Sequence, residues 1–134
     1  MKHKLIIIFL MCTIPVLAVN NQSVKKIDVD KANKLISSNE NNPDFVILDV
    51  RTPEEFSSGH LQNAVNIDYK SDNFKNELDK LDKQKTYVVH CRSGGRAAAS
   101  VDIMKELGFE NVYDMGGIVQ WQEQGYDITK PENK

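Results

Sequence analysis

The sequence has little cysteine: Cys12 and Cys91 are the two thiols in 134 residues. Two cysteines are too few for the disulfide framework that holds many small exported domains together. If the N-terminal residues are removed, as argued next, Cys91 is left with no partner, which argues against dithiol exchange chemistry. The remaining two histidines and one cysteine show no metal-ligand spacing, so we expect no metal site and no cofactor.

No apolar run is long enough to span a membrane. The apolar stretch at residues 5–17 has thirteen residues, whereas a transmembrane helix needs roughly 20. Lys2 and Lys4 precede it and the small residue Ala18 follows it, a pattern typical of a secretory signal peptide. We therefore predict that residues 1–18 are cleaved after Ala18 and that the mature protein is periplasmic, without stable membrane insertion. An uncleaved membrane anchor is the alternative.

The sequence also lacks an excess of basic residues. It contains 17 Lys and Arg against 19 Asp and Glu, for a net charge of −2. Without residues 1–18 the count is 15 basic and 19 acidic residues, for a net charge of −4. These charges argue against a nucleic-acid partner. The sequence does not indicate an oligomeric state.

The length fits one domain, and 40% hydrophobic with 27% charged residues is typical of a globular one. We expect this domain at residues 25–128, between a flexible lead-in at 19–24 and a C-terminal tail at 129–134. Short apolar runs of strand length alternate with segments of helical character. Strands are expected near residues 26–27 and at residues 45–50, 64–67, 86–90 and 111–114, and helices at residues 30–36, 53–58, 72–81, 97–107 and 118–124. This alternation predicts an α/β fold with a central parallel sheet of about five strands and helices on both faces.

Two helices carry more detailed expectations. Thr52 followed by Pro53 and two acidic residues is typical of a helix N-terminus. In the helix at residues 97–107, the apolar side chains expected on one buried stripe are Ala98, Val101, Met104 and Leu107. Phe56 and Trp121 are expected in the core.

The loop at residues 91–96 follows an apolar strand and precedes a helix. Ligands of open α/β sheets bind at such positions. Its glycines free the backbone N–H groups to converge on one centre, and the helix N-terminus and two arginines add positive charge. These features stabilise an anion, which suits both a reactive thiolate and a small oxyanion substrate. Cys91 is the candidate nucleophile, and the candidate substrate-binding residues are Arg92, Ser93, Gly94, Gly95 and Arg96.

Several alternatives stay open around this loop. Cys91 as a plain core residue is disfavoured, because a core cysteine does not call for two glycines and two arginines directly after it. Arg96 is favoured as a substrate ligand. For Arg92, the interpretations as a ligand and as a solvated surface residue are equally favoured. Asp49 and Arg51 end a strand on the same sheet edge. They either support the site or form a structural ion pair that caps the helix starting near Pro53, and the second interpretation is preferred. His90 should point to the opposite side of the sheet from Cys91.

With these residues the sequence resembles the single-domain rhodaneses, which are thiosulfate sulfurtransferase-like proteins. Three separated stretches carry the resemblance, and together they span about residues 26–126. They are residues 48–51 with 55–56 and 59–61; the loop at 91–96; and residues 116–118 with Trp121 and 125–126. The resemblance implies that Cys91 takes a sulfane sulfur from a small donor such as thiosulfate, becomes a persulfide, and passes the sulfur to cyanide or a thiol acceptor.

The resemblance also bears on the choice of reaction. Sulfur-transferring members of this superfamily have a six-residue loop, whereas the related dual-specificity phosphatases and arsenate reductases have seven. The loop at residues 91–96 has six residues, which favours sulfur over phosphorus. A phosphatase or arsenate reductase and a non-catalytic sulfur-carrier or interaction module remain as alternatives.

Overall fold

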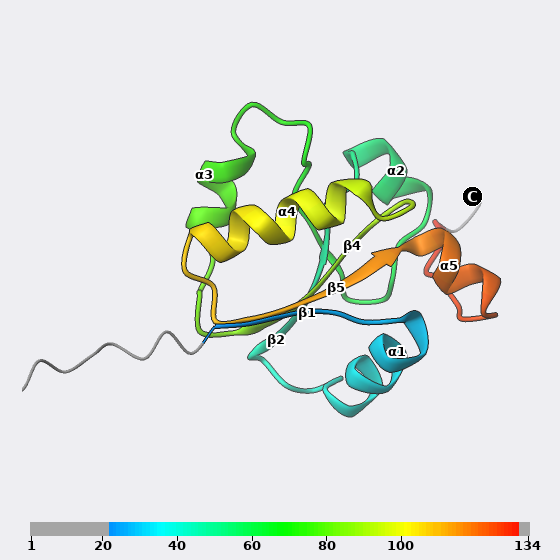
Figure 1. The fold of residues 1–134 in the computed structure, drawn as a ribbon. Helices are drawn as coiled ribbons and strands as arrows, with labels where there is room; N and C mark the ends of the chain where they lie inside the picture. The colour runs from blue at the N-terminus through cyan, green and yellow to red at the C-terminus, as the bar shows by residue number, and fades with distance from the viewer. Residues whose placement is uncertain (1–21, 132–134) are drawn as a thin grey trace, which may run out of the picture.

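The computed structural model describes residues 22–131. The predicted signal peptide at residues 1–18 and its cleavage site lie outside the described residues. The described part contains five strands and five helices that alternate along the chain (Figure 1). The strands are β1 (Ser23–Lys26), β2 (Phe45–Asp49), β3 (Val65–Asn66), β4 (Thr86–Cys91) and β5 (Asn111–Gly117); the helices are α1 (Val29–Ser38), α2 (Pro53–Ser58), α3 (Phe74–Asp79), α4 (Gly95–Glu106) and α5 (Ile118–Glu123).

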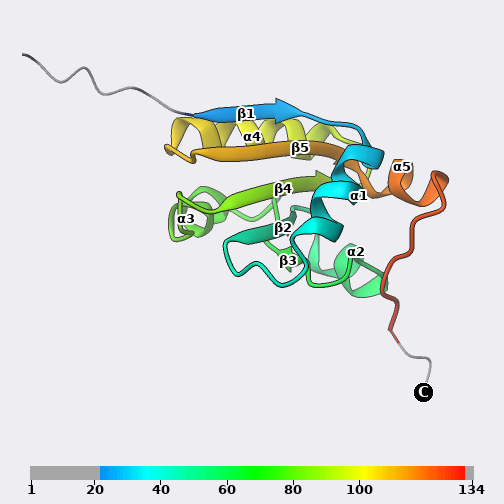
Figure 2. The ribbon, with the colours of Figure 1, turned by 90° about the horizontal axis from the view of Figure 1, so that it is seen from below.

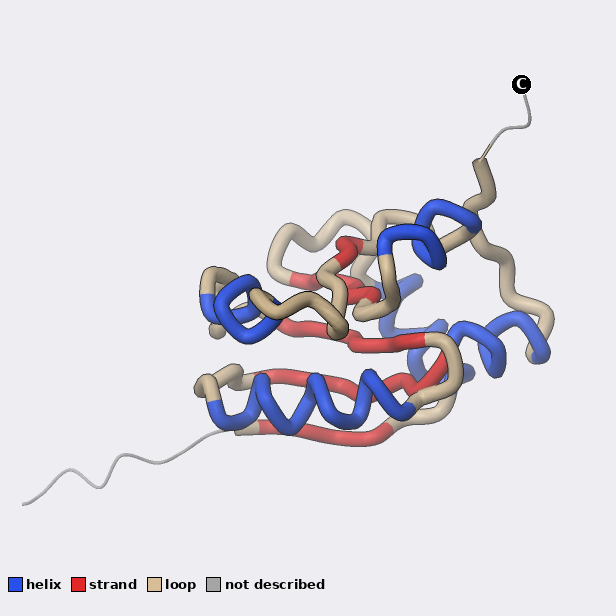
Figure 3. Tube along the Cα trace, turned by 90° about the horizontal axis from the view of Figure 1, so that it is seen from above, coloured by secondary structure: helices blue, strands red, loops and turns tan. Residues whose placement is uncertain are grey.

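The five strands form one sheet in the order β1-β5-β4-β2-β3, and every pair in it is parallel. Helices α3 and α4 cover one face, whereas α1 and α5 cover the other (Figures 1 and 2). Seen from above, α4 runs along the sheet beside β4 and β5 (Figure 3). The predicted α/β fold with a parallel five-stranded sheet and helices on both faces is confirmed.

Each face of the sheet has its own hydrophobic core. On the α4 face the fully buried residues include Leu48, Tyr87 and Met104. On the other face, Ile47 and Val88 pack with side chains from α1 and α5. Neighbouring strand residues alternate between the two cores, as a pleated strand requires. Cys91 and Val89 share the α4 face, so His90 between them points to the opposite one, as predicted.

Strand β1 begins earlier than the sequence indicated. Ser23 and Val24, expected in the flexible lead-in, pair in parallel with Asn111 and Val112 of β5. Val24 also packs against the core on the α4 face, which gives this edge strand its hydrophobic anchor. At the other end, the predicted tail begins at Thr129, whose backbone exchanges hydrogen bonds of 2.9 and 2.7 Å with His60.

Two core predictions are wrong. Ala98 is exposed and Ala97 is buried, because seven residues make almost two full helical turns and so bring Ala97 onto the same side as Met104. Ala98 was predicted on the buried stripe from a spacing of three residues, but residues at that spacing do not stay on one face of a helix. Phe56 is half-buried and stacks its ring on His60 at 3.9 Å between ring centres. Trp121 is in the core as predicted, with 5% of its surface exposed.

Candidate active site

Cys91 is the last residue of β4, at the carboxyl edge of the sheet where the chain turns into α4 (Figure 1). The residue is 1% exposed. Its Sγ accepts a hydrogen bond of 3.0 Å from the backbone N–H of Gly94. Gly94 is also the N-cap of the 12-residue helix α4, so the sulfur lies against the positive end of that helix. Both features favour a negatively charged sulfur.

The turn requires glycine at position 94. Gly94 has φ 120° and ψ −23°, a conformation that residues with a Cβ rarely adopt. This geometry aims its N–H at the Cys91 sulfur rather than at a helical carbonyl. The next residue, Gly95, starts the helix and is exposed. The loop thus presents the backbone N–H of Gly94 to the sulfur.

The end of β5 supports the loop from one side. The carbonyl oxygen of Arg92 accepts a hydrogen bond of 3.1 Å from the backbone N–H of Val119. A Cβ at Gly117 would overlap this same carbonyl, so only glycine allows the close approach. The strand predicted at residues 111–114 extends further, because Gly116 and Gly117 also belong to β5, where they pair with His90 and Cys91. Gly117 is a site residue that the local sequence did not reveal.

The two arginines of the loop differ in their surroundings. Arg96 is half-buried and forms a two-point ion pair with Glu55 of α2: Nη1 donates to Oε2 at 2.7 Å and Nη2 to Oε1 at 2.8 Å. Arg92 is exposed, and within residues 22–131 its guanidinium has no hydrogen bond or ion pair. Ser93 is exposed as well. The arginine favoured as a substrate ligand is therefore held by a carboxylate, whereas Arg92 is free to meet a ligand.

Glu55 has two tasks. Its backbone N–H donates to Oγ1 of Thr52, and its carboxylate accepts from the Thr52 backbone N–H at 3.0 Å, which forms the capping box of α2. The carboxylate also accepts from Oγ1 of Thr52 at 3.1 Å and from both terminal nitrogens of Arg96. The hydrogen bonds from Arg96, followed by those from Thr52, hold the pKa of Glu55 well below its ordinary value, against the opposing effect of burial. The hydrogen bond to Glu55 also raises the pKa of Arg96. The capping signal is visible in the sequence, but the contact across 41 residues is not.

Asp49 and Arg51 form a buried ion pair at the end of β2. Nη2 of Arg51 lies 2.7 Å from Oδ2 of Asp49, and the two residues are 5% and 0% exposed. The same Nη2 donates to the carbonyl of Gly59 at 2.7 Å, which ties the C-terminal end of α2 to the sheet. The preferred interpretation as a structural ion pair agrees with this geometry. Thr52 and Glu55, rather than the ion pair, cap α2.

His90 lies beneath Cys91, on the other face of the sheet, and is fully buried. Its Nδ1 is 3.1 Å from the carbonyl oxygen of Cys91, and its Nε2 is 3.6 Å from Oδ2 of Asp49. Burial lowers the pKa of His90; Asp49 and the Cys91 carbonyl oppose this shift, and Arg51 adds to it. The ring is therefore neutral, and we place its proton on Nδ1, where the acceptor is within hydrogen-bond distance. Nε2 is left without a hydrogen bond.

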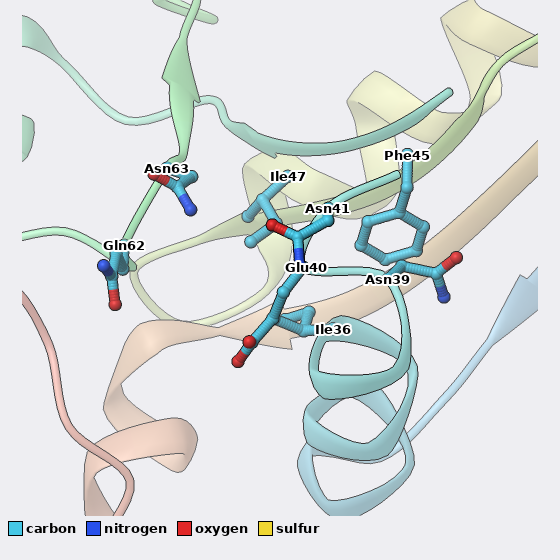
Figure 4. Close-up of a pocket in the computed structure, with 8 residues that line it drawn as sticks. All are labelled: Ile36, Asn39, Glu40, Asn41, Phe45, Ile47, Gln62 and Asn63. Atoms are coloured by element: carbon cyan, nitrogen blue, oxygen red, sulfur yellow. The ribbon is translucent and has the colours of Figure 1, made fainter. Parts of the chain in front are cut away.

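A cavity of about 290 Å³ lies away from this loop, on the α1 side of the sheet (Figure 4). Its lining residues come from the end of α1, the following turn, β2 and the segment before β3, and none belongs to the loop at residues 91–96; they are Ile36, Asn39, Glu40, Asn41, Phe45, Ile47, Gln62 and Asn63. Within residues 22–131 no group of three His, Cys, Asp or Glu side chains is placed to hold a metal ion. In the same residues no helix is long and apolar enough to cross a bilayer.

Comparison with known proteins gives a consistent result. The family model described as the rhodanese-like domain matches residues 28–124. The Bacillus subtilis (strain 168) protein named "Putative sulfurtransferase YtwF" is 32% identical over 110 residues, which cover 82% of this chain and 98% of that protein. A protein named tRNA uridine(34) hydroxylase from Yersinia pestis (strain Pestoides F) is 34% identical over 110 residues, but the chain spans only 29% of it.

Solved structures show the same fold. A rhodanese-like domain protein from Staphylococcus aureus is 33% identical, with a TM-score of 0.61 over 79% of this chain and 99% of that one. A rhodanese-related protein from Thermoplasma volcanium is 30% identical, with a TM-score of 0.65 over 78% of this chain and 97% of that one.

Proposed function

The chain belongs to the rhodanese-like family, and from this premise we propose that it is a sulfurtransferase with Cys91 as its nucleophile. The observation that carries the proposal is the contact between the Cys91 sulfur and the Gly94 N–H at the start of α4. A buried core cysteine would need no such donor. A sulfur that becomes a thiolate, and later a persulfide, gains from it at each stage.

The proposed reaction has two steps, and neither needs an external oxidant. The Cys91 thiolate attacks the outer sulfur of a donor such as thiosulfate; a new S–S bond forms, the donor's S–S bond breaks, and sulfite leaves with the electron pair. Cyanide or a thiolate acceptor then attacks the terminal sulfur of the Cys91 persulfide. The acceptor keeps that sulfur, as thiocyanate when cyanide attacks, and the Cys91 thiolate is restored.

The loop residues have distinct roles in this proposal. The backbone N–H of Gly94 donates to the sulfur and stabilises its negative charge. In this proposal the N–H groups of Ser93 and Gly95 complete the anion cradle, and the exposed guanidinium of Arg92 receives the anionic donor. Arg96 affects the sulfur and the donor through its charge rather than through a hydrogen bond, because its terminal nitrogens already donate to Glu55. No histidine is required as a base, since a preformed thiolate attacks directly. His90 is sequestered on the opposite face and does not approach the donor.

We further propose that the protein acts in the periplasm after cleavage behind Ala18. The basic start, the thirteen-residue apolar stretch and the small residue at the expected cut support this. Fractionation of expressing cells, followed by N-terminal sequencing of the protein, tests it. Valine 19 as the first residue in the periplasmic fraction is the expected result, and an intact Met1 in the cytoplasmic fraction contradicts it.

The relatives named tRNA uridine(34) hydroxylase raise the question of an RNA substrate. The shared region is 29% of those proteins, and the present chain has a net charge of −2 and no basic cluster beyond its two loop arginines. RNA binding relies on positive charge along the nucleic-acid path. The charge therefore favours a small sulfur donor over RNA.

The catalytic proposal is tested by thiosulfate-dependent formation of thiocyanate, with Cys91→Ser as the matched variant. Wild-type protein should turn over repeatedly, and Cys91→Ser should lose the activity completely. A persulfide that forms on Cys91 but passes to no small acceptor would indicate a sulfur-carrier or interaction module. Turnover of an aryl phosphate that Cys91→Ser abolishes would indicate a phosphatase instead.

A further inference from the structure

The two arginines of the loop do not contribute equally to its charge. Arg96 is paired at two points with Glu55, at 2.7 and 2.8 Å. Arg92 is exposed, and its guanidinium has no ion-pair partner in the part of the chain that the structure describes. A loop with two arginines in sequence therefore offers an incoming donor only one cation whose charge is not already neutralised.

Glu55 is linked to the sulfur through Arg96. Cys91 and Arg96 interact electrostatically, and the guanidinium that Cys91 senses is the one bound to Glu55. With Cys91 as a thiolate, the formal charges of Cys91, Arg92, Arg96 and Glu55 sum to zero. If Glu55 were neutral, the same site would carry a net positive charge.

We propose that Glu55 is a specificity-determining residue, which selects sulfur donors with a single negative charge over dianions. The proposal rests on the sulfurtransferase function above and refines its donor class. The favoured donors are alkyl persulfides, R–S–S⁻, whereas thiosulfate, with two negative charges, is used less efficiently. Because Glu55 cancels the charge of Arg96, an additional negative charge on the donor gains no net attraction from this pair, whereas Arg96 alone would attract it.

The chemical step with a persulfide is balanced without any further reactant. The Cys91 thiolate attacks the terminal sulfur of R–S–S⁻, the S–S bond of the donor breaks, and R–S⁻ leaves with the electron pair. The product on the protein is the Cys91 persulfide, the same intermediate that thiosulfate gives. When the same acceptor is used for both donors, the difference between their efficiencies therefore reports on the loading of sulfur onto Cys91 alone.

Glu55→Gln isolates the charge of this residue. Glutamine also closes a capping box, so α2 keeps its N-terminal hydrogen bonds, and the amide oxygen still accepts from Arg96. Glu54→Gln is the matched control, because Glu54 lies in the same turn of α2, carries the same charge and is exposed. Both variants remove one negative charge from α2, but only Glu55→Gln removes it from the ion pair.

The measurement is kcat/KM for thiosulfate and for 2-hydroxyethyl persulfide, with cyanide as the common acceptor at low ionic strength. Glu55→Gln should raise the ratio of thiosulfate to persulfide efficiency by roughly two- to fifteenfold, the range that Coulomb's law gives for one unit charge acting over a separation on the order of 10 Å at effective dielectric constants of about 80 to 20. The increase should shrink at about 0.5 M salt, where exposed charges are screened. Glu54→Gln should leave the ratio unchanged.

Arg96→Gln provides a second test with the opposite sign. It leaves the Glu55 carboxylate without its partner, so the ratio of thiosulfate to persulfide efficiency should fall. Opposite changes from the two halves of one ion pair cannot arise from a general loosening of α2.

An unchanged ratio in Glu55→Gln, an equal rise in Glu54→Gln, or changes of the same sign in Glu55→Gln and Arg96→Gln would overturn the inference. If neither donor loads sulfur onto wild-type Cys91, the proposed function itself is wrong, and the inference falls with it.

Discussion

Burial of His90 as a neutral ring should make the stability of the fold depend on pH in a defined window. The folded protein lowers the pKa of His90 below the ordinary value of 6.5, mainly through burial. At mildly acidic pH, His90 is therefore protonated in the unfolded chain but stays neutral in the folded protein. The contribution of His90 to stability is fully present above pH 6.5 and is lost as the pH falls below that value.

The expected size of this loss follows from proton linkage. For a ring that stays neutral in the folded state, the free energy of unfolding falls by about 1.4 kcal/mol between pH 7.5 and pH 5.5, and by about 2 kcal/mol at pH 5.0. The groups that face the ring are Asp49, Arg51 and the Cys91 carbonyl. Glu55 does not titrate in this window, because its pKa lies well below its ordinary value.

His90→Phe removes the titrating group while it keeps an aromatic ring in the same buried place. At pH 7.5 the variant should be less stable by about 1–2 kcal/mol, because the Cys91 carbonyl loses its donor. Urea unfolding of both proteins between pH 5.0 and 7.5 measures the difference directly. The two stabilities should converge as the pH falls, by about 1.4 kcal/mol at pH 5.5. A difference that stays constant or grows over this range would refute the assignment of a neutral His90.

Three further substitutions test the scaffold around the loop. Gly117→Ala would push its Cβ into the Arg92 carbonyl, so the rate of sulfur loading on Cys91, followed by stopped-flow, should fall about tenfold or more; an unaffected rate would show that the loop tolerates the displacement. Thr52→Ala removes the N-cap of α2 and should cost about 1 kcal/mol in urea unfolding, and no measurable cost would contradict the capping role. Leu48→Ala opens a cavity at a position with no exposed surface and should cost about 2–5 kcal/mol in the same assay; a cost below 1 kcal/mol would mean that the core collapses around it.

The local sequence was sufficient where a structure depends on near neighbours. The apolar run at β2 and the Thr52 cap of α2 were both predicted, since each depends on hydrophobic burial or on a hydrogen bond over three residues. The position of Cys91 at the carboxyl edge of the sheet also followed from the strand that leads into it. The family resemblance added the chemistry, and the comparisons support its coarse form.

Long-range contacts were the features that the sequence did not reveal. The ion pair between Arg96 and Glu55 joins residues 41 positions apart, and no local pattern distinguishes an arginine that binds substrate from one that binds a carboxylate. The close approach of Gly117 to Arg92 depends on the register between β4 and β5. The exposed Ala98 shows a further limit, because apolar residues at spacings of three do not stay on one helical face.

The central claim is that Cys91 carries the transferred sulfur, and mass spectrometry tests it most directly. Protein incubated with thiosulfate should gain about 32 Da, the mass of one sulfur atom, and peptide mapping should place it on Cys91. The adduct should disappear when cyanide is added, and Cys91→Ser should never acquire it. An unmodified Cys91, or an adduct on any other residue, would contradict the account.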